Sequence, residues 1–156
     1  MVGQRFITLM ENHPWFRLTV IAASARSAGK PYGEAAEKRW VMPSPIPACA
    51  RDLVVMDAVA DAEKIASLVD FCFCAVDMPK DEIRALEERY AKLECPIVSN
   101  NSANRMVADV PMIIPEINPE HAQVIPAQRK RLSTRTGFIT AKSNCSIQSY
   151  VPALSC

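Results

Sequence analysis

The sequence predicts an α/β fold with a mainly parallel sheet, and two observations support this prediction. Segments with helical periodicity alternate with short apolar segments along the 156 residues, which is the order that strand–helix–strand units produce. Several apolar segments, such as 18–23, are continuous rather than alternating, as in parallel strands that are buried on both faces. The length suits one ordinary domain.

Local signals place the individual elements. A helix is expected at 4–12, because Pro14 and the residue before it disfavour its continuation. The clearest helix is expected at 79–93, where a proline suits the first helical position and apolar residues recur every three or four positions. The proline-rich segment 30–50 is expected to be irregular. The other predicted elements are strands at 18–23, 53–56, 70–76, 96–99, 112–114 and 137–140, a helix at 119–131, and a short helix that begins near Ser146.

The charge balance argues against a nucleic-acid or membrane-surface partner. The chain has 18 basic and 17 acidic residues and a net charge of +1, whereas such partners select a broad basic surface. The one dense basic run, 129–131, is expected to be a solvated helix face. No apolar segment approaches the roughly 20 residues that span a bilayer, and the N-terminal residues do not resemble a signal peptide. A cytoplasmic location is therefore expected.

The six cysteines are expected to be reduced in that compartment. None belongs to a Cys-x-x-Cys pair, so no metal site is expected. Cys72 and Cys74 lie on one predicted strand and are expected to be small buried apolar residues. The others are Cys49, Cys95, Cys145 and Cys156.

Two segments have features of a dinucleotide-binding site. Gly3, at the start of the first helix, matches the last glycine of a phosphate-binding loop, where a helix N-terminus meets the pyrophosphate. The segment 24–30 follows the next strand, at the place where such folds contact the adenosine ribose. It contains Ser24, Arg26 and Ser27 and no acidic residue. Hydroxyl and guanidinium groups bind a 2′-phosphate, so this segment favours NADP over NAD.

Together these segments resemble the aspartate-semialdehyde dehydrogenases of the archaeal and fungal type, also found in bacteria. The resemblance continues in order through Ser99-Asn100-Asn101, Arg105, the Pro-Glu-Ile-Asn-Pro-Glu-His segment at 115–121, and Asn144-Cys145-Ser146. It implies a Rossmann-like, doubly wound fold that lacks its first strand. It also implies an NADP-binding domain at 1–140, followed at 141–156 by the catalytic turn and the start of a truncated catalytic domain.

The resemblance implies roles for ten residues. Gly3 and Gln4 would lie at the cofactor pyrophosphate, and Ser24, Arg26 and Ser27 at the 2′-phosphate. Ala75 would line the cofactor cleft and Asn100 would lie near the nicotinamide. Arg105 would bind the phosphate of the substrate, and Asn144 with Cys145 would form the catalytic turn.

The position of Cys145 suits a nucleophile. It lies between a predicted strand and a predicted helix, and the positive end of a helix dipole favours a thiolate. The implied reaction is the NADP-dependent reduction of aspartyl phosphate to aspartate semialdehyde through a cysteine thioester, with release of phosphate. This reaction belongs to lysine, threonine and methionine biosynthesis.

Three departures from the family pattern lead us to expect that this chain alone is inactive and binds NADP poorly. The first strand and the start of the glycine loop would lie before Met1. The catalytic histidine and the residues that bind the substrate carboxylate would lie beyond residue 156, and His13 and His121 are expected to be structural. Ser143 stands where the family usually has proline.

Other functions stay open at this point. A related acyl reductase, such as malonyl-CoA reductase or N-acetylglutamyl-phosphate reductase, uses the same thiolate and the same cofactor. A non-catalytic Rossmann remnant is a third possibility. By resemblance the full-length enzyme is a homo-oligomer, which the sequence itself does not show.

Overall fold

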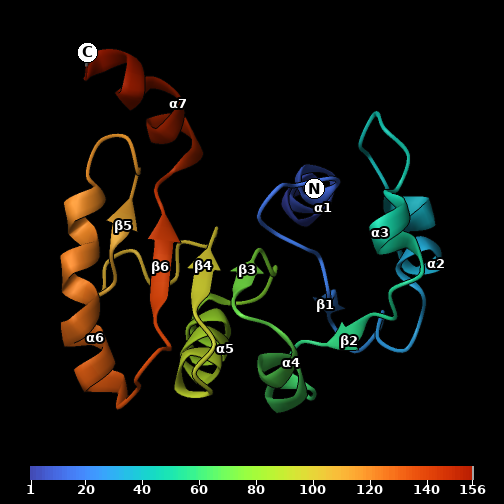
Figure 1. The fold of residues 1–156 in the computed structure, drawn as a ribbon, viewed down its shortest axis with the longest axis horizontal. Helices are drawn as coiled ribbons and strands as arrows, with labels where there is room; N and C mark the ends of the chain where they lie inside the picture. The colour runs from blue at the N-terminus through green and yellow to red at the C-terminus, as the bar shows by residue number, and fades with distance from the viewer. Residues whose placement is uncertain (156) are drawn as a thin grey trace. The chain divides into compact units, whose positions relative to one another are not determined.

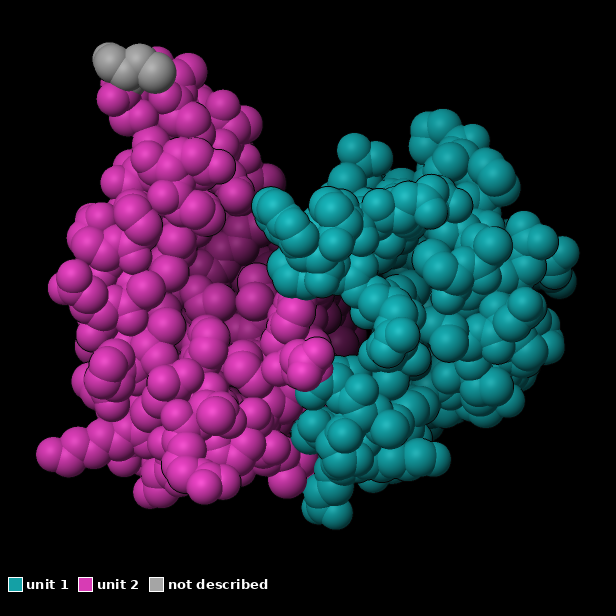
Figure 2. All heavy atoms as spheres, in the orientation of Figure 1, with its two compact units in different colours: residues 1–69 teal, residues 70–156 magenta. Residues whose placement is uncertain are grey.

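The computed structural model describes residues 1–155 and divides the chain into two compact units, Met1–Val69 and Asp70–Cys156 (Figure 2). Both units combine helices with parallel strands, so the predicted α/β fold is confirmed (Figure 1). Within the described residues no helix is both long and apolar enough to cross a membrane.

The first unit contains a two-stranded parallel sheet in which Ala22 pairs with Met56. Its core joins Ile7 of the first helix to Ile21, Ala50 and Val55. Its elements are α1 (Val2–Met10), β1 (Ala22–Ala23), α2 (Tyr32–Ala36), the 3-10 helix η1 (Glu37–Arg39), α3 (Ala48–Arg51), β2 (Met56–Asp57) and α4 (Ala62–Leu68).

The strand predicted at 18–23 is much shorter in the structure, and its partner explains why. Only Ala22 and Ala23 belong to β1. The residues before β2 bond to the segment 30–32 and not to the residues before β1. The Tyr32 amide donates to the Leu53 carbonyl, and the Val55 amide donates to the Lys30 carbonyl. Backbone groups that would have paired with 18–20 therefore bond to the segment 29–32 instead.

Two other expectations for this unit need correction. The segment 30–50 was expected to be irregular but contains three short helices, α2, η1 and α3. α4 was not predicted, although two of its residues, Ala62 and Ile65, are buried.

The second unit contains a four-stranded, all-parallel sheet in the order β3-β4-β6-β5. α5 packs against β4, β6 and α6, and its apolar stripe of Ile83, Leu86 and Tyr90 is buried. In Figure 1 the four strands point the same way, toward the end from which α7 continues. Its elements are β3 (Cys72–Cys74), α5 (Lys80–Lys92), β4 (Ile97–Ser99), β5 (Met112–Ile113), η2 (Pro119–Val124), α6 (Ile125–Leu132), β6 (Ile139–Lys142) and α7 (Cys145–Leu154).

The carboxylate of Glu94 holds the segment before β6 against the end of α5. Glu94, which follows α5, accepts the backbone N–H groups of Arg135, Thr136 and Gly137 and the Thr136 hydroxyl. These backbone hydrogen bonds lower the pKa of the Glu94 carboxyl to about 2. At the same junction Gly137 lies so close to α5 that an added Cβ would be 1.8 Å from the Ala91 carbonyl oxygen.

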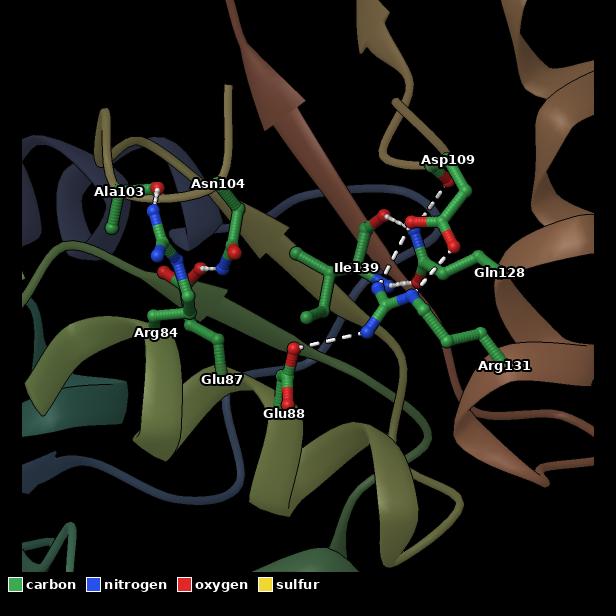
Figure 3. Close-up of polar contacts among 9 residues, drawn as sticks. All are labelled: Arg84, Glu87, Glu88, Ala103, Asn104, Asp109, Gln128, Arg131 and Ile139. Carbon is green, nitrogen blue, oxygen red and sulfur yellow. Dashed lines mark hydrogen bonds and ion pairs between the residues drawn. The ribbon is translucent and has the colours of Figure 1, made fainter. Parts of the chain in front are cut away.

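The fully buried Gln128 of α6 joins the helix to β6 (Figure 3). Its Oε1 accepts from the Ile139 amide at 2.6 Å, and its Nε2 donates to the Ile139 and Asp109 carbonyls at 2.9 and 2.8 Å. β5 pairs with β6 only at Ala141 and Lys142. The Gln128 amide therefore occupies hydrogen-bonding positions of β6 that β5 does not reach.

Candidate functional site

In the first unit, Gln4 lies on α1, whose first turn also contains the exposed Gly3. The Gln4 side chain donates to the Arg39 carbonyl at 2.6 Å and accepts from the Val41 amide at 3.1 Å. Gln4 thus ties the start of α1 to the segment 39–41.

The segment after β1 forms a tight turn. The Ser27 amide donates to the Ser24 carbonyl at 2.9 Å, and Gly29 adopts a left-handed conformation with φ +80° that favours glycine. Ser24 and Arg26 are exposed, whereas Ser27 is buried. Hydroxyl and guanidinium donors therefore border one turn, as binding of a phosphate group requires.

A second arginine, which the sequence analysis did not identify, lies at this turn. The Arg39 guanidinium donates to the Ser27 hydroxyl at 3.1 Å and to the Ala35 carbonyl at 2.8 Å. Arg39 therefore contacts both Gln4 and Ser27 and joins two of the predicted cofactor residues. No local signal distinguishes it within the segment 37–39, because its position depends on the fold of 30–50.

In the second unit, Ala75 and Asn100 follow the carboxyl ends of the neighbouring strands β3 and β4. The Asn100 amide donates to the Cys74 carbonyl at 2.8 Å, which continues the pairing of the two strands. In open parallel sheets ligands bind at this end of the strands. Both residues therefore lie where a cofactor-binding residue is expected.

Arg105, in the loop after β4, connects that loop to the end of β6. Its Nε donates to the Lys142 carbonyl at 2.9 Å, and one terminal nitrogen lies 3.3 Å from both the Asn100 and Ser143 carbonyls. The structure thus brings Arg105, Asn100 and the turn that precedes Cys145 together. A guanidinium held in this way presents its remaining N–H groups in a fixed direction.

Cys145 is the first residue of α7, as the strand-to-helix position predicted, and it is exposed. Asn144 caps the helix: its Oδ1 accepts from the Ser146 amide at 2.9 Å, and the Cys145 sulfur lies 3.9 Å from the same oxygen. Ser143, just before the cap, is 2% exposed. The turn is therefore anchored by the buried Ser143 and presents the Cys145 thiol to solvent.

Cys72, Cys74 and Cys95 are less accessible than Cys145. Cys74 is buried, and burial together with the nearby Glu87 carboxylate raises the pKa of its thiol to about 12. The sulfurs of Cys72 and Cys95 lie 3.6 Å apart, and this contact, with burial, raises the pKa of Cys72. Both Cys72 and Cys74 therefore remain protonated thiols near neutral pH, which suits packing rather than nucleophilic attack.

Both histidines contact backbone. The ring Nδ1 of His13 accepts from the Trp15 and Phe16 amides, and that of His121 lies 3.3 Å from the Met112 amide. Within the described residues of the second unit, the His121 ring is not hydrogen-bonded to Cys145. No group of three metal-ligating side chains occurs in that part of the chain.

The sequence analysis missed a buried carboxylate beside the site. Glu87 of α5 is 1% exposed and contacts Asn104 (Figure 3) and Ser99, each also 1% exposed. The helical periodicity contains a signal for it, because residue 87 lies four positions after Ile83 and three before Tyr90 on the buried stripe.

Comparisons with known proteins identify the family of the chain. The model of the family described as semialdehyde dehydrogenase, NAD binding domain, matches residues 1–125. The chain is 44% identical over 146 residues to the aspartate-semialdehyde dehydrogenase of Methanothermobacter thermautotrophicus, covering 94% of this chain and 40% of that protein. It is 38% identical to the enzyme of the same name from Saccharomyces cerevisiae, covering 98% and 41%.

The solved structures give the same result. The aspartate semialdehyde dehydrogenase of Candida albicans, solved with NADP, superposes with a TM-score of 0.81 at 33% identity and covers 98% of this chain and 42% of that one. A Vibrio cholerae structure with a TM-score of 0.65 and 22% identity supports the fold. The chain spans about 40% of the length of the curated relatives it matches. The chain therefore belongs to the semialdehyde dehydrogenase family, whose NAD-binding domain its residues 1–125 match.

Proposed function

We propose that this chain contributes the nucleotide-binding region and the nucleophile of an NADP-dependent aspartate-semialdehyde dehydrogenase. The observation that supports the nucleophile most directly is the exposed thiol of Cys145 at the start of α7, beside the Asn144 cap. The names of the curated relatives support aspartate as the substrate class over malonyl-CoA.

The donor groups of the first unit fit an NADP phosphate. The turn at 24–30 offers the exposed side chains of Ser24 and Arg26, and Arg39 adds a second guanidinium next to Ser27. No carboxylate of this turn would repel a 2′-phosphate. Gly3 and Gln4 would serve the pyrophosphate, and Ala75 and Asn100 would line the cofactor site in the second unit. The bound cofactor would supply the hydride.

The residues of the second unit would carry out acyl transfer. The Cys145 thiolate attacks the acyl carbon of aspartyl phosphate, the carbon–oxygen bond to phosphate breaks, and a thioester forms with release of inorganic phosphate. Cys145 is the first residue of α7 and so lies at the positive end of that helix dipole. Asn144 keeps that helix start capped, and Arg105 would hold the departing phosphate.

Acylation tests this proposal, because it needs only the groups named above. After incubation with aspartyl phosphate, peptide mass spectrometry should find an aspartyl group on Cys145, in equal amount to the phosphate released. The group should be absent from Cys145→Ser and present in Cys49→Ser, which removes the other exposed cysteine of residues 1–155. Repeated NADPH oxidation is not expected, since His121, the histidine of the same unit, does not bond to Cys145 among the described residues.

Two outcomes would contradict the proposal. Acyl groups spread equally over Cys49 and Cys145 would argue against a specific nucleophile. Acylation by malonyl-CoA but not by aspartyl phosphate would favour the related acyl reductase. For the complete enzyme we also propose a cytoplasmic homo-oligomer, as the resemblance of the sequence to the family implies.

A further inference from the structure

We propose that Glu87 is a positioning residue: from α5 it fixes the loop after β4, and through Arg105 in that loop it holds the turn that presents Cys145. The inference rests on the proposed nucleophilic role of Cys145. It concerns a residue whose hydrogen bonds go to the loop after β4 and not to the Cys145 thiol.

The carboxylate of Glu87 organises the first half of the loop. Its Oε1 accepts the Ser99 hydroxyl, and the same hydroxyl oxygen accepts the Asn101 amide at 3.0 Å. Its Oε2 accepts from Nδ2 of Asn104 at 2.7 Å, and Asn101 Nδ2 lies 3.4 Å from Oε1. One side chain therefore fixes both ends of the segment 99–104.

A second side chain of α5 strengthens this attachment. Arg84, one turn before Glu87, donates to the Ala103 carbonyl at 2.8 Å (Figure 3). Ala103 and Asn104 are 4% and 1% exposed. The residue that follows this buried pair is Arg105, so its backbone position is set by the two tethers.

Arg105 transmits the position of the loop to the catalytic turn. Its guanidinium donates to the carbonyls of Lys142 and Ser143, and the next residue is Asn144, the cap of α7. The path from Glu87 to the Cys145 turn thus consists of buried hydrogen bonds and one arginine.

The surroundings of Glu87 favour this role over one in stability alone. The part of the chain that the structure describes gives it no ion pair, and its partners are neutral: the side chains of Ser99, Asn101 and Asn104 and the thiol of Cys74. A buried carboxyl group without a cation is costly compared with an apolar residue. An apolar side chain would pack on α5 as well, but it would release the loop.

The test compares Glu87→Gln with Glu88→Gln, the same change at the next residue of α5. Glu88 is paired with Arg131 at 3.1 Å and does not contact the loop. Alkylation by iodoacetamide is followed from pH 6 to 10 by peptide mass spectrometry, with the exposed Cys49 as internal reference. Circular dichroism establishes that each variant is folded.

We expect Glu87→Gln to slow the alkylation of Cys145 at pH 7 about two- to fivefold, which is the factor expected when a helix-terminal interaction is weakened. The pH midpoint of the alkylation rate should move upward. Cys49 and the Glu88→Gln protein should not change. Combining Glu87→Gln with Arg105→Ala should add nothing to Arg105→Ala alone, because Arg105 lies on the path. If Glu87→Gln does not fold, Ser99→Ala removes one partner of the carboxylate and should give the same direction.

An unchanged pH profile of Cys145 in a folded Glu87→Gln or Ser99→Ala protein would overturn the inference. Equal slowing in Glu88→Gln would also overturn it. If Cys145 of the parent reacts no faster than Cys49, the proposed nucleophile is wrong. The positioning role is then decided by hydrogen exchange at the Ser146 and Gln148 amides, which should exchange faster in Glu87→Gln and not in Glu88→Gln.

Discussion

Replacing Gly137 with alanine tests how closely β6 must approach the end of α5. The new Cβ would lie 1.8 Å from the Ala91 carbonyl oxygen, 2.8 Å from its carbonyl carbon and 3.1 Å from the Glu94 Cα. Ordinary contact begins near 3.4 Å, so the strand and the helix end must separate by about 1.6 Å. All three neighbours are backbone atoms, which cannot move away as a flexible side chain would.

The size of the effect follows from this separation. Overpacking by one methyl group usually costs about 1–3 kcal/mol, and a clash with backbone belongs at or above the upper value. The shift would also disturb the hydrogen bond from the Gly137 amide to Glu94. A loss of about 3 kcal/mol in the free energy of unfolding corresponds to a drop of about 12–24 °C in melting temperature for a unit of this size.

The assay must report on the second unit. Both tryptophans, Trp15 and Trp40, belong to the first unit, so their fluorescence is unsuitable, and far-UV circular dichroism with hydrogen exchange at the β4 and β6 amides is appropriate. Gly3→Ala is the control, because nothing lies within 4 Å of its added Cβ and alanine favours a helix. A Gly137→Ala protein within about 0.5 kcal/mol of the parent would refute the close approach.

Two further predictions concern the same sheet. Glu94→Gln should lower the melting temperature at pH 7. In the parent, the stability that Glu94 gives is complete above its ordinary pKa of 4.5 and is lost as the pH falls from there through about 2, so the difference between the two proteins should vanish near pH 2. Gln128→Leu should cost about 2–4 kcal/mol by urea unfolding, because it leaves the buried amide and carbonyl of Ile139 without partners.

Each of these predictions has a matched control. Glu88→Gln removes a half-exposed ion pair with Arg131 and should change stability by less than about 1 kcal/mol. Gln123→Leu makes the Gln128 change at an exposed position. If Glu94→Gln lowers the melting temperature by the same amount at pH 2 and at pH 7, the assigned Glu94 contacts are wrong. If Gln128→Leu and Gln123→Leu reduce the free energy of unfolding equally, the assigned Gln128 contacts are wrong.

The sequence predicted elements whose signals are local. α5 was expected at 79–93 and lies at Lys80–Lys92, because its apolar stripe and its proline start are both encoded within the helix. A helix was also expected to begin near Ser146, and α7 begins one residue earlier, at Cys145, where Asn144 caps it. Boundaries of this kind need no information from distant residues.

Features that depend on distant residues were not predictable in the same way. β1 is short because the segment 53–55 bonds to 29–32, and no property of 18–23 reveals that choice. Arg39 reaches Ser27 only because α2 and η1 fold back on the turn. Glu87 is an intermediate case: its helical position indicates burial, but its partners Ser99 and Asn104 come from another element.

The Gln128 side-chain amide affects whether a strand of another molecule can add to this sheet. An unpaired stretch at the border of a sheet is a template on which a strand of another molecule can add. At Ile139 that stretch is already occupied, by a side chain instead of a strand. A second molecule would have to displace a fully buried amide before it could extend the sheet there, so Gln128 protects the protein against self-association just before the point where β5 begins.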